Sequence, residues 1–239
     1  MGGGVFINLK DVQKNWEGLA QDNPLGAIIT SEKNWDLENF FKTGINEIND
    51  LMMYLETLNK QISTKKAVDF GCGVGRLTQP LTNFFDKVYG IDISPTMIKL
   101  ANELFPEDKC EFVLNEKDNL ELFENNSMDF VYSNITLLHM EPKYSKKYIK
   151  EFLRILEPGG ISIFYLPSKA LGINKLKTNF VKKSFTSIIN FFKDNVVEMY
   201  VIKEEEICRL VEEQNGIILD VKRNEEGGYI TSRYSVTKN

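Results

Sequence analysis

Cysteine and histidine are scarce in this 239-residue chain, and their scarcity argues against several kinds of site. The three cysteines, Cys72, Cys110 and Cys208, are odd in number and widely spaced, so they do not suggest a disulfide framework. Reduced thiols are typical of a cytosolic protein, which predicts a cytoplasmic location. No cluster has the spacing of metal ligands, and we therefore expect no metal site.

Long hydrophobic runs and an excess of positive charge are also absent. The longest apolar runs have the length of strands, far short of a membrane span. The N-terminal M-G-G-G-V-F-I-N-L-K has no basic segment followed by a long apolar run, so we expect no signal peptide. The formal net charge is −5, whereas general phosphate binding needs a basic surface, so we expect no nucleic-acid partner.

What the chain does contain is the composition of one soluble globular domain, with 42% hydrophobic and 26% charged residues. Its length suffices for a single sizeable core, and no internal repeat is present. Residues 10–60 are expected to be helical, because from Phe41 onward their apolar side chains fall three or four apart.

Short β-type runs alternate with helical segments in the middle of the chain. The expected strands are Lys66–Phe70, Lys87–Ile91, Cys110–Leu114, Met128–Ser133 and Ile161–Leu166. One helix is expected to begin at Ser94-Pro95, since serine is a good N-cap and proline fits the first helical position. Another helix, Tyr144–Leu156, is expected to stop before Pro158-Gly159-Gly160. Such alternation predicts a parallel sheet with helices on both faces.

The C-terminal part has a different order of elements. A helix is expected over Glu204–Gln214, followed by two β-runs, Ile217–Val221 and Tyr229–Val236, which N-E-E-G-G joins into an antiparallel pair. The complete expectation is a doubly wound, Rossmann-like α/β fold. Its sheet is mostly parallel and seven-stranded, with a C-terminal antiparallel hairpin.

Three glycines at every second position, Gly71, Gly73 and Gly75, directly follow the first expected strand in A-V-D-F-G-C-G-V-G. In such folds a ligand binds at the carboxyl ends of the strands. Glycines there allow unusual backbone angles and remove the Cβ that would block a close approach. The dinucleotide fingerprint G-x-G-x-x-G requires a glycine where Arg76 stands, and no Gly-Lys-Ser/Thr follows as in a phosphate loop.

Two carboxylates narrow the choice of ligand. Asp92 closes the second strand, and its carboxylate can accept hydrogen bonds from vicinal ribose hydroxyls. Asp69 lies two residues before Gly71 and is expected to point its negative charge into the cleft, which suits an ammonium group better than a pyrophosphate. S-adenosylmethionine has an amino-acid ammonium at one end and a ribose at the other.

Four segments in this order resemble the class I S-adenosylmethionine-dependent methyltransferases of the small-molecule type: V-D-F-G-C-G-V-G-R, Y-G-I-D-I-S-P-T-M-I, M-D-F-V-Y-S and L-R-I-L-E-P-G-G. The resemblance covers residues 65–166, and the terminal hairpin extends it to the C-terminus. It implies S-adenosylmethionine as cofactor and S-adenosylhomocysteine as product. It also implies direct displacement of the methyl group by a nitrogen, oxygen or carbon of a small-molecule, sugar-linked or lipid-linked acceptor.

The resemblance further implies a single methyltransferase domain over residues 1–239. Residues 1–64 would form a helical lid and residues 65–166 the cofactor-binding core. Residues 167–200 would be a basic cap insertion, and residues 201–239 the C-terminal helix and hairpin.

Individual roles follow from the same resemblance. The residues expected at the methionine end of the cofactor are Asp69, Gly71, Gly73 and Gly75, and Phe70, Cys72 and Arg76 are also expected to bind the cofactor. Asp92 is expected at the ribose, Ile93 and Met97 beside the adenine, and Asn115 or Glu116 at its edge, where the family often has aspartate. Ser133 and Asn134 would face the methionine carboxylate or the acceptor, and Tyr165 would face the acceptor.

Several residues have both a functional and a structural interpretation. His139, the only histidine, is either a general base beside the transferred methyl group or a structural residue bonded to backbone. Arg76 either binds an acidic acceptor or makes local contacts, and Cys72 fills a place that simply needs a small residue. Trp16 and Trp35 either exclude water from the site as part of the lid or belong to the core.

Residues 168–193 contain six lysines and no acidic residue, interleaved with large apolar side chains. One interpretation is a cap that attracts an anionic or lipid-linked acceptor, or contacts an anionic membrane surface. The other is an amphipathic helix with a solvated lysine face.

Two rival functions are left open by the sequence. An NAD-dependent oxidoreductase is disfavoured by Arg76 in place of the third fingerprint glycine. A non-catalytic scaffold that binds S-adenosylmethionine would keep the fold without the reaction. A nucleic-acid methyltransferase is disfavoured by the negative net charge, and because S-N-I-T stands where an N/D-P-P-Y/F motif is expected.

Overall fold

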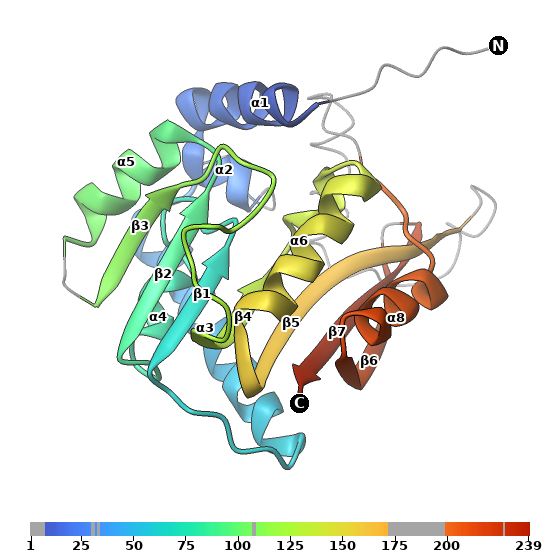
Figure 1. Ribbon diagram of the computed structural model, residues 1–239. Coiled ribbons are helices and arrows are strands. Elements are labelled where there is room, and N and C mark those ends of the chain that lie inside the picture. The colour runs from blue at the N-terminus through green and yellow to red at the C-terminus, as the bar shows by residue number, and fades with distance from the viewer. Residues whose placement is uncertain (1–7, 30–31, 33, 107–108, 172–198, 227) are drawn as a thin grey trace, which may run out of the picture.

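The computed structural model describes residues 8–29, 32, 34–106, 109–171, 199–226 and 228–239. The strands in these residues are β1 (Lys66–Phe70), β2 (Lys87–Asp92), β3 (Cys110–Leu114), β4 (Met128–Ser133), β5 (Leu156–Ala170), β6 (Gly216–Glu226) and β7 (Tyr229–Lys238). They form one sheet in the order β3-β2-β1-β4-β5-β7-β6 (Figure 1). β1 to β5 are parallel, whereas β7 is antiparallel to both β5 and β6. The predicted seven-stranded, mostly parallel sheet with a C-terminal hairpin is thus confirmed.

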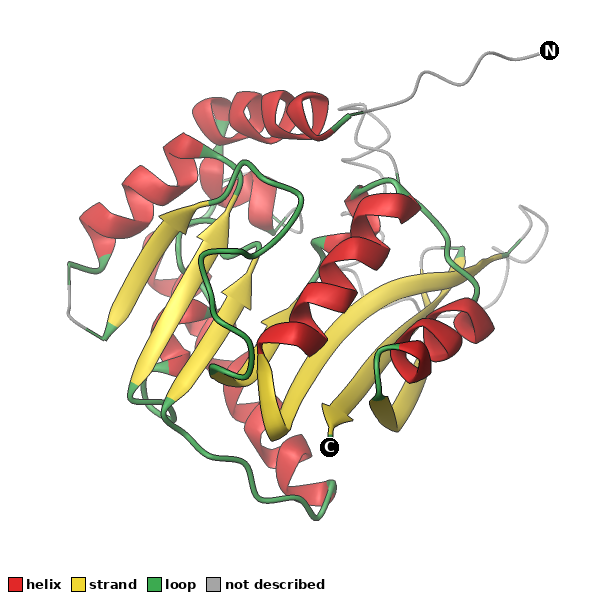
Figure 2. Ribbon diagram, viewed as in Figure 1, coloured by secondary structure: helices red, strands yellow, loops and turns green. Residues whose placement is uncertain are grey.

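Helices cover both faces of this sheet and its upper edge (Figure 2). They are α1 (Leu9–Asp22), α2 (Pro24–Ile28), α3 (Leu37–Thr57), α4 (Thr78–Leu81), α5 (Pro95–Leu104), α6 (Pro142–Ile155) and α8 (Glu204–Glu213), with a 3-10 turn η1 (Leu137–His139). α3, α4 and α5 pack on one face, and α6 and α8 on the other. α1 and α2 lie over the carboxyl ends of β1 to β3 (Figure 1).

Strand alternation sorts the core side chains between these two layers. On β1 and β4, Ala67, Phe130 and Tyr132 pack with α3, whereas Val68 and Val131 pack with α6 and α8. Every residue of β4 is buried, because helices cover both of its faces. The sheet edge at which its parallel strands end is the edge that α1 covers (Figure 1).

The helix start predicted at Ser94 is confirmed. The Ser94 hydroxyl accepts a hydrogen bond from the Met97 N–H at 3.1 Å, and Pro95 occupies the first helical position. This cap fixes α5 directly behind the end of β2, so the chain turns sharply away after Asp92.

Other bounds differ from the expectations. The helix after the glycine turn, α4, has only four residues, because the chain continues in i to i+3 turns from Thr82 to Phe84. β5 begins at Leu156 and runs to Ala170, so it includes the Pro158-Gly159-Gly160 segment. The pairing of β4 with β5 has a register shift between Met128 and Phe130, opposite this segment. Pairing with β7 extends β5, and the local sequence pattern does not contain that information.

Most of the lysine-rich segment 168–193 lies outside the described residues, because the structure does not describe residues 172–198. Its two interpretations therefore stay predictions. In the part of the chain that is described, no helix is both long enough and apolar enough to cross a membrane.

Candidate functional site

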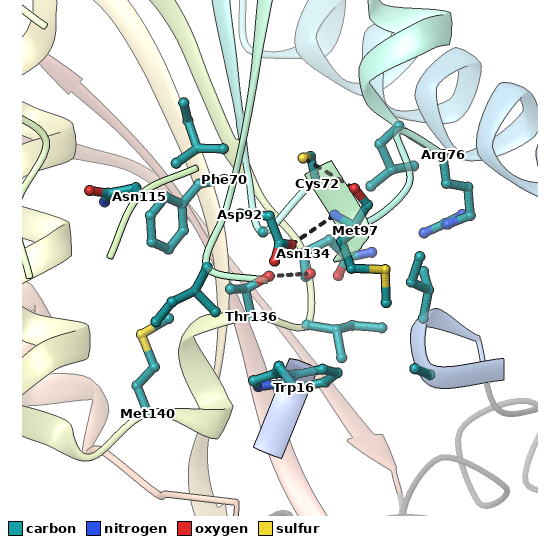
Figure 3. Close-up of a pocket in the computed structure, with 18 of the residues that line it drawn as sticks. Trp16, Phe70, Cys72, Arg76, Asp92, Met97, Asn115, Asn134, Thr136 and Met140 are labelled. Atoms are coloured by element: carbon teal, nitrogen blue, oxygen red, sulfur yellow. Dashed lines mark hydrogen bonds between the residues drawn. The ribbon is translucent and has the colours of Figure 1, made fainter. Parts of the chain in front are cut away.

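A pocket opens at the carboxyl ends of β1, β2 and β4, beneath α1 (Figure 3). Its lining residues are Val12, Trp16, Ala27, Ile28, Phe70, Gly71, Cys72, Gly73, Arg76, Leu77, Ile91, Asp92, Ile93, Met97, Asn115, Asn134, Ile135, Thr136, Met140 and Tyr148. The volume is about 930 Å³ with the open mouth included. This figure includes open solvent, so it is an upper bound on the space that the lining residues enclose.

The glycine turn after β1 forms one wall and requires glycine for two separate reasons. Gly71 and Gly73 have φ angles of +82° and +54°, which other residues adopt at a cost. A Cβ on Gly71 would lie 2.0 Å from Thr136 Oγ1, and one on Gly73 would lie 2.5 Å from Ile28 Cδ1. The backbone therefore approaches the loop after β4 and the helix α2 more closely than a side chain would permit.

Asp92, the last residue of β2, sits beside this turn with its carboxylate already oriented. Its two oxygens accept hydrogen bonds from the N–H groups of Gly73 and Ser94, both at 2.9 Å. Burial raises the pKa of the Asp92 carboxyl, and these two N–H donors work against that rise. Each carboxylate oxygen keeps a second lone pair, which can accept a hydrogen bond from a ligand in the pocket.

Asp69 does not line the pocket, in contrast to the orientation expected from the sequence. Its side chain points to the face of the sheet covered by α4, where the carboxylate accepts a hydrogen bond from Thr78 Oγ1 at 2.7 Å. The reason is strand alternation, since the next residue, Phe70, is the one directed into the pocket. Burial raises the pKa of Asp69 to about 7, and the bond from Thr78 lowers it by less.

The raised pKa of Asp69 gives a pH-dependent prediction. The folded protein keeps this proton up to about pH 7, whereas an unfolded chain loses it near its ordinary pKa of 3.8, so this group makes folding less favourable as pH rises between those values. Asp69→Asn should remove that dependence. Relative to wild type, its free energy of unfolding should rise by about 2 kcal/mol from pH 5 to pH 7.

Urea unfolding of the two proteins at both pH values measures this difference. Asp86→Asn, on an exposed side chain directly before β2, is the control and should show no such change. A difference between Asp69→Asn and wild type that is equal at both pH values would contradict a buried, protonated Asp69.

The loop after β4 forms the opposite wall. Asn134, Ile135 and Thr136 all line the pocket, and Thr136 Oγ1 donates to the Asn134 carbonyl at 3.1 Å. Ile135 has a φ of +57°, a conformation that is uncommon for a β-branched residue. Backbone strain of this kind concentrates at ligand sites, where the surrounding structure holds it in place.

α1 closes the pocket from above, and hydrogen bonds fasten it to the start of α5. Figure 3 shows Trp16 on one side of the pocket and Asp92 on the other. Glu17 accepts hydrogen bonds from Ser94 Oγ at 2.6 Å and from Thr96 Oγ1 at 2.5 Å. Burial raises the pKa of Glu17, but these hydrogen bonds outweigh it and hold the pKa below its usual value. The charged form of Glu17 therefore stabilises the packing of α1 against the start of α5.

Besides Asp69, three of the expected site residues lie near the pocket without lining it: Gly75, Ser133 and Glu116. The missing Cβ of Gly75 makes room for Phe112, whose ring carbon would otherwise lie 2.9 Å away. Ser133 Oγ donates to the Phe70 carbonyl at 3.1 Å. Glu116 is exposed and accepts a hydrogen bond from Gln13 of α1 at 2.5 Å.

His139 and Tyr165 also lie behind the lining. The buried His139 ring packs edge-on against Trp16, with 5.4 Å between ring centroids. The Tyr165 ring contacts Tyr132 on the α3 side of the sheet, with centroids 6.4 Å apart. The structure thus places both side chains one layer away from the pocket.

Cys72 lines the pocket, but its thiol is poorly reactive. Burial raises the pKa of its thiol well above the usual value, which disfavours the reactive thiolate. All three cysteines are free. No group of three or more histidine, cysteine, aspartate or glutamate side chains among the described residues is arranged to hold a metal ion.

Part of the pocket lining was not predicted from the sequence, and much of it lies outside the glycine turn and the strand ends. The residues that were not predicted are Val12, Ala27, Ile28, Leu77, Ile91, Ile135, Thr136, Met140 and Tyr148. Ile135 and Thr136 could have been found, since they follow Asn134 directly after β4. The side chains from α1 and α2 carry no local signal, because their place depends on how the lid packs.

Comparison with known proteins agrees with this geometry. Residues 68–164 match the family model described as a methyltransferase domain. The chain is 30% identical over 131 residues to the ubiquinone biosynthesis O-methyltransferase of Nitrosococcus oceani, covering 54% of this chain and 55% of that protein. It is 31% identical over 112 residues to the tRNA N(3)-methylcytidine methyltransferase of Drosophila melanogaster, covering 43% of this chain and 34% of that protein. The chain thus spans about a third to about half of the length of these two curated relatives.

A solved structure extends the comparison to the fold. Magnesium protoporphyrin IX methyltransferase from Synechocystis, with S-adenosylhomocysteine bound, superposes with a TM-score of 0.66 at 18% identity. The match covers 97% of this chain and 100% of that one, and at this identity it establishes a shared fold. Residues 68–164 thus match the methyltransferase domain family, and the seven-stranded sheet shares the fold of a solved methyltransferase with S-adenosylhomocysteine bound.

Proposed function

We propose that this protein transfers the methyl group of S-adenosylmethionine to a small-molecule acceptor. The observation that carries the proposal is the junction of Gly71, Gly73 and Asp92 at one edge of the sheet. There the backbone lies open for close approach, and a carboxylate is oriented beside it. An amino-acid group beside the glycines and a ribose on the carboxylate fit this arrangement, so the residues present suit the cofactor of the family.

In this proposal, each part of the cofactor has its own residues. Asp92 accepts hydrogen bonds from the ribose hydroxyls, and Gly71 and Gly73 lie at the methionine end. Met97 and Asn115, which both line the pocket, border the adenine. Asp69 supports the glycine turn from the opposite face instead of contacting the ligand directly.

S-adenosylmethionine, when bound, supplies a sulfonium methyl group that is already activated for displacement. The protein therefore needs mainly to align the acceptor and to exclude water. Alignment of two reactants can contribute roughly 7–11 kcal/mol to lowering the barrier. Trp16 and Val12 cover the pocket from α1, and Glu17 fastens that helix to α5, so these residues are assigned the exclusion of water.

The proposed acceptor is a small molecule with an apolar body. Phe70, Ile135 and Met140 give the pocket apolar walls, whereas Asn134 and Thr136 offer polar atoms beside them. The two relatives are named for ubiquinone biosynthesis and for a tRNA, and the solved neighbour is named for a porphyrin. The net charge of −5 supports a small molecule over a nucleic acid for this chain. His139 contacts Trp16, which supports its structural interpretation over that of a general base.

Calorimetric titration with S-adenosylmethionine, S-adenosylhomocysteine and NAD tests the proposal, followed by mass spectrometry of a methylation panel. The panel contains 1,4-hydroquinone, phosphoethanolamine and a porphyrin carboxylate. We expect micromolar binding of the first two ligands only, and methylated product at the highest rate from one acceptor class. Binding without any methylated product would favour the non-catalytic scaffold. Binding of NAD alone would favour the oxidoreductase and contradict the proposal.

A further inference from the structure

Glu47, in the middle of α3, gathers three side chains from the carboxyl ends of two strands. Its carboxylate forms an ion pair with Arg76 at 2.9 Å and accepts hydrogen bonds from Tyr132 Oη at 2.9 Å and Asn134 Nδ2 at 2.5 Å. Tyr132 belongs to β4, Asn134 follows it, and Arg76 follows the glycine turn after β1. Nothing in the sequence motifs singled out Glu47, because it lies in the helical N-terminal part of the chain.

Two of these partners line the pocket, so Glu47 acts on the pocket through them. Arg76 and Asn134 are both lining residues, and Figure 3 shows them with the other side chains around the pocket. α3 is held close at this point, since a Cβ on Gly44 would lie 2.1 Å from the Arg76 carbonyl oxygen. Gly44 lies one turn before Glu47, and its close contact fixes where the carboxylate reaches the sheet edge.

The charge of Arg76 is balanced inside the protein. Its side chain is 7% exposed, and among the described residues Glu47 is its ion-pair partner. An enclosed guanidinium with a carboxylate partner is neutralised and has little attraction left for another anion. Arg76 therefore does not give the pocket a free positive charge, which favours local contacts over a grip on an acidic acceptor as its role.

Glu47 also orients Asn134. The Asn134 amide nitrogen donates to Glu47, which turns the amide oxygen away from that carboxylate. The amide oxygen is an acceptor, suited to the O–H or N–H group of a ligand. The pocket wall made by Arg76 and Asn134 is thus uncharged overall and offers a hydrogen-bond acceptor.

We propose that Glu47 is a specificity-determining residue, because it neutralises Arg76 and orients Asn134. The pocket wall made by these two residues then selects an acceptor with an uncharged hydrogen-bond donor, which is a hydroxyl or a neutral amine. The same wall rejects an acceptor with an anionic group. The inference rests on the proposed function, since it concerns the acceptor of the transferred methyl group. The electrostatic part, however, can be tested without any acceptor.

The first test uses inorganic phosphate as the probe of free positive charge. Thermal melting of wild type, Glu47→Gln and Glu56→Gln is measured with and without phosphate at constant ionic strength and with S-adenosylhomocysteine present, which favours the folded state. Glu56, exposed on the same helix, provides the matched control. We expect phosphate to stabilise Glu47→Gln alone, with an apparent phosphate affinity about tenfold above that of wild type, the effect of a charge-assisted hydrogen bond.

The double variant Glu47→Gln with Arg76→Gln identifies the source of the effect. It lacks both charges and should lose the phosphate response. A phosphate response of equal size in wild type and Glu47→Gln would overturn the proposal, as would a response that persists in the double variant.

The second test measures specificity directly. With Glu47→Gln, the rate of methylation of phosphoethanolamine relative to 1,4-hydroquinone should rise about tenfold over wild type. The far-ultraviolet circular dichroism of Glu47→Gln should match that of wild type, which a general loss of structure would not allow. If no panel compound is methylated by wild type, the proposed function fails, whereas the phosphate experiment still decides whether Glu47 neutralises Arg76.

Discussion

Replacement of Asp92 by alanine is expected to lower the affinity for S-adenosylmethionine and S-adenosylhomocysteine by about 100-fold or more. Hydrogen bonds to a charged group contribute about 1.5–3 kcal/mol each, and the ribose would lose two of them. Each 1.4 kcal/mol corresponds to about tenfold in the dissociation constant. Alanine also removes the acceptor of the Gly73 N–H group, so the glycine turn itself loses support. Isothermal titration calorimetry measures the loss.

Two further variants make this result interpretable. Asp92→Asn keeps the shape and one acceptor oxygen, and should fall between wild type and alanine. Asp86→Ala removes an exposed carboxylate at the opposite end of the same strand and should bind both ligands normally. Normal affinity in Asp92→Ala would contradict the placement of the ribose at the end of β2.

Gly71→Ala is expected to abolish detectable binding of the cofactor. The residue has a φ of +82°, where alanine costs about 1–2 kcal/mol. In addition, the new methyl group would lie 2.0 Å from Thr136 Oγ1 and 2.7 Å from its Cβ, so rotation of the threonine side chain cannot relieve the clash. The loop after β4 would have to move, which displaces one wall of the pocket. Calorimetric titration and thermal melting together measure both effects.

Gly159 provides the matched control for that substitution. It has a φ of +86°, nearly that of Gly71, but a Cβ there would meet nothing within 4 Å. Gly159→Ala should therefore lower stability by the backbone cost alone and leave cofactor affinity intact. Equal losses of stability in the two variants, with normal binding in Gly71→Ala, would show that the close packing against Thr136 is unimportant.

The parts of the site that could be predicted from sequence are the residues at or just after the end of a single strand, because their sequence pattern is local. Gly71 and Gly73 follow β1 directly, and Asp92 closes β2, so parallel strands bring them to the same edge of the sheet. The period of two in the strands and of three to four in the helices is a property of the local chain. The order of elements, and with it the fold, could therefore be derived before any contact was known.

The parts that could not be predicted depend on packing between distant segments. Glu17 reaches Ser94, and Glu47 reaches Asn134, across separations of 77 and 87 residues. Asp69 lies in the glycine motif, yet the alternation of side chains along β1 turns it away from the pocket and Phe70 toward it. Alternation along β1 places Asp69 and Phe70 on opposite faces, but only the packing of α1 and α4 decides which of the two faces borders the pocket.

By itself, the sequence determined the alternation of strands and helices, the close-approach turn at Gly71 and Gly73, and the acidic end of β2, because each is encoded within a few neighbouring residues. Only the tertiary structure decided that α1 closes the pocket, that Asp69 is buried behind it, and that Arg76 is neutralised by Glu47. These outcomes depend on which charges and apolar faces meet when elements far apart in the chain pack together, and packing of that kind is a property of the whole fold.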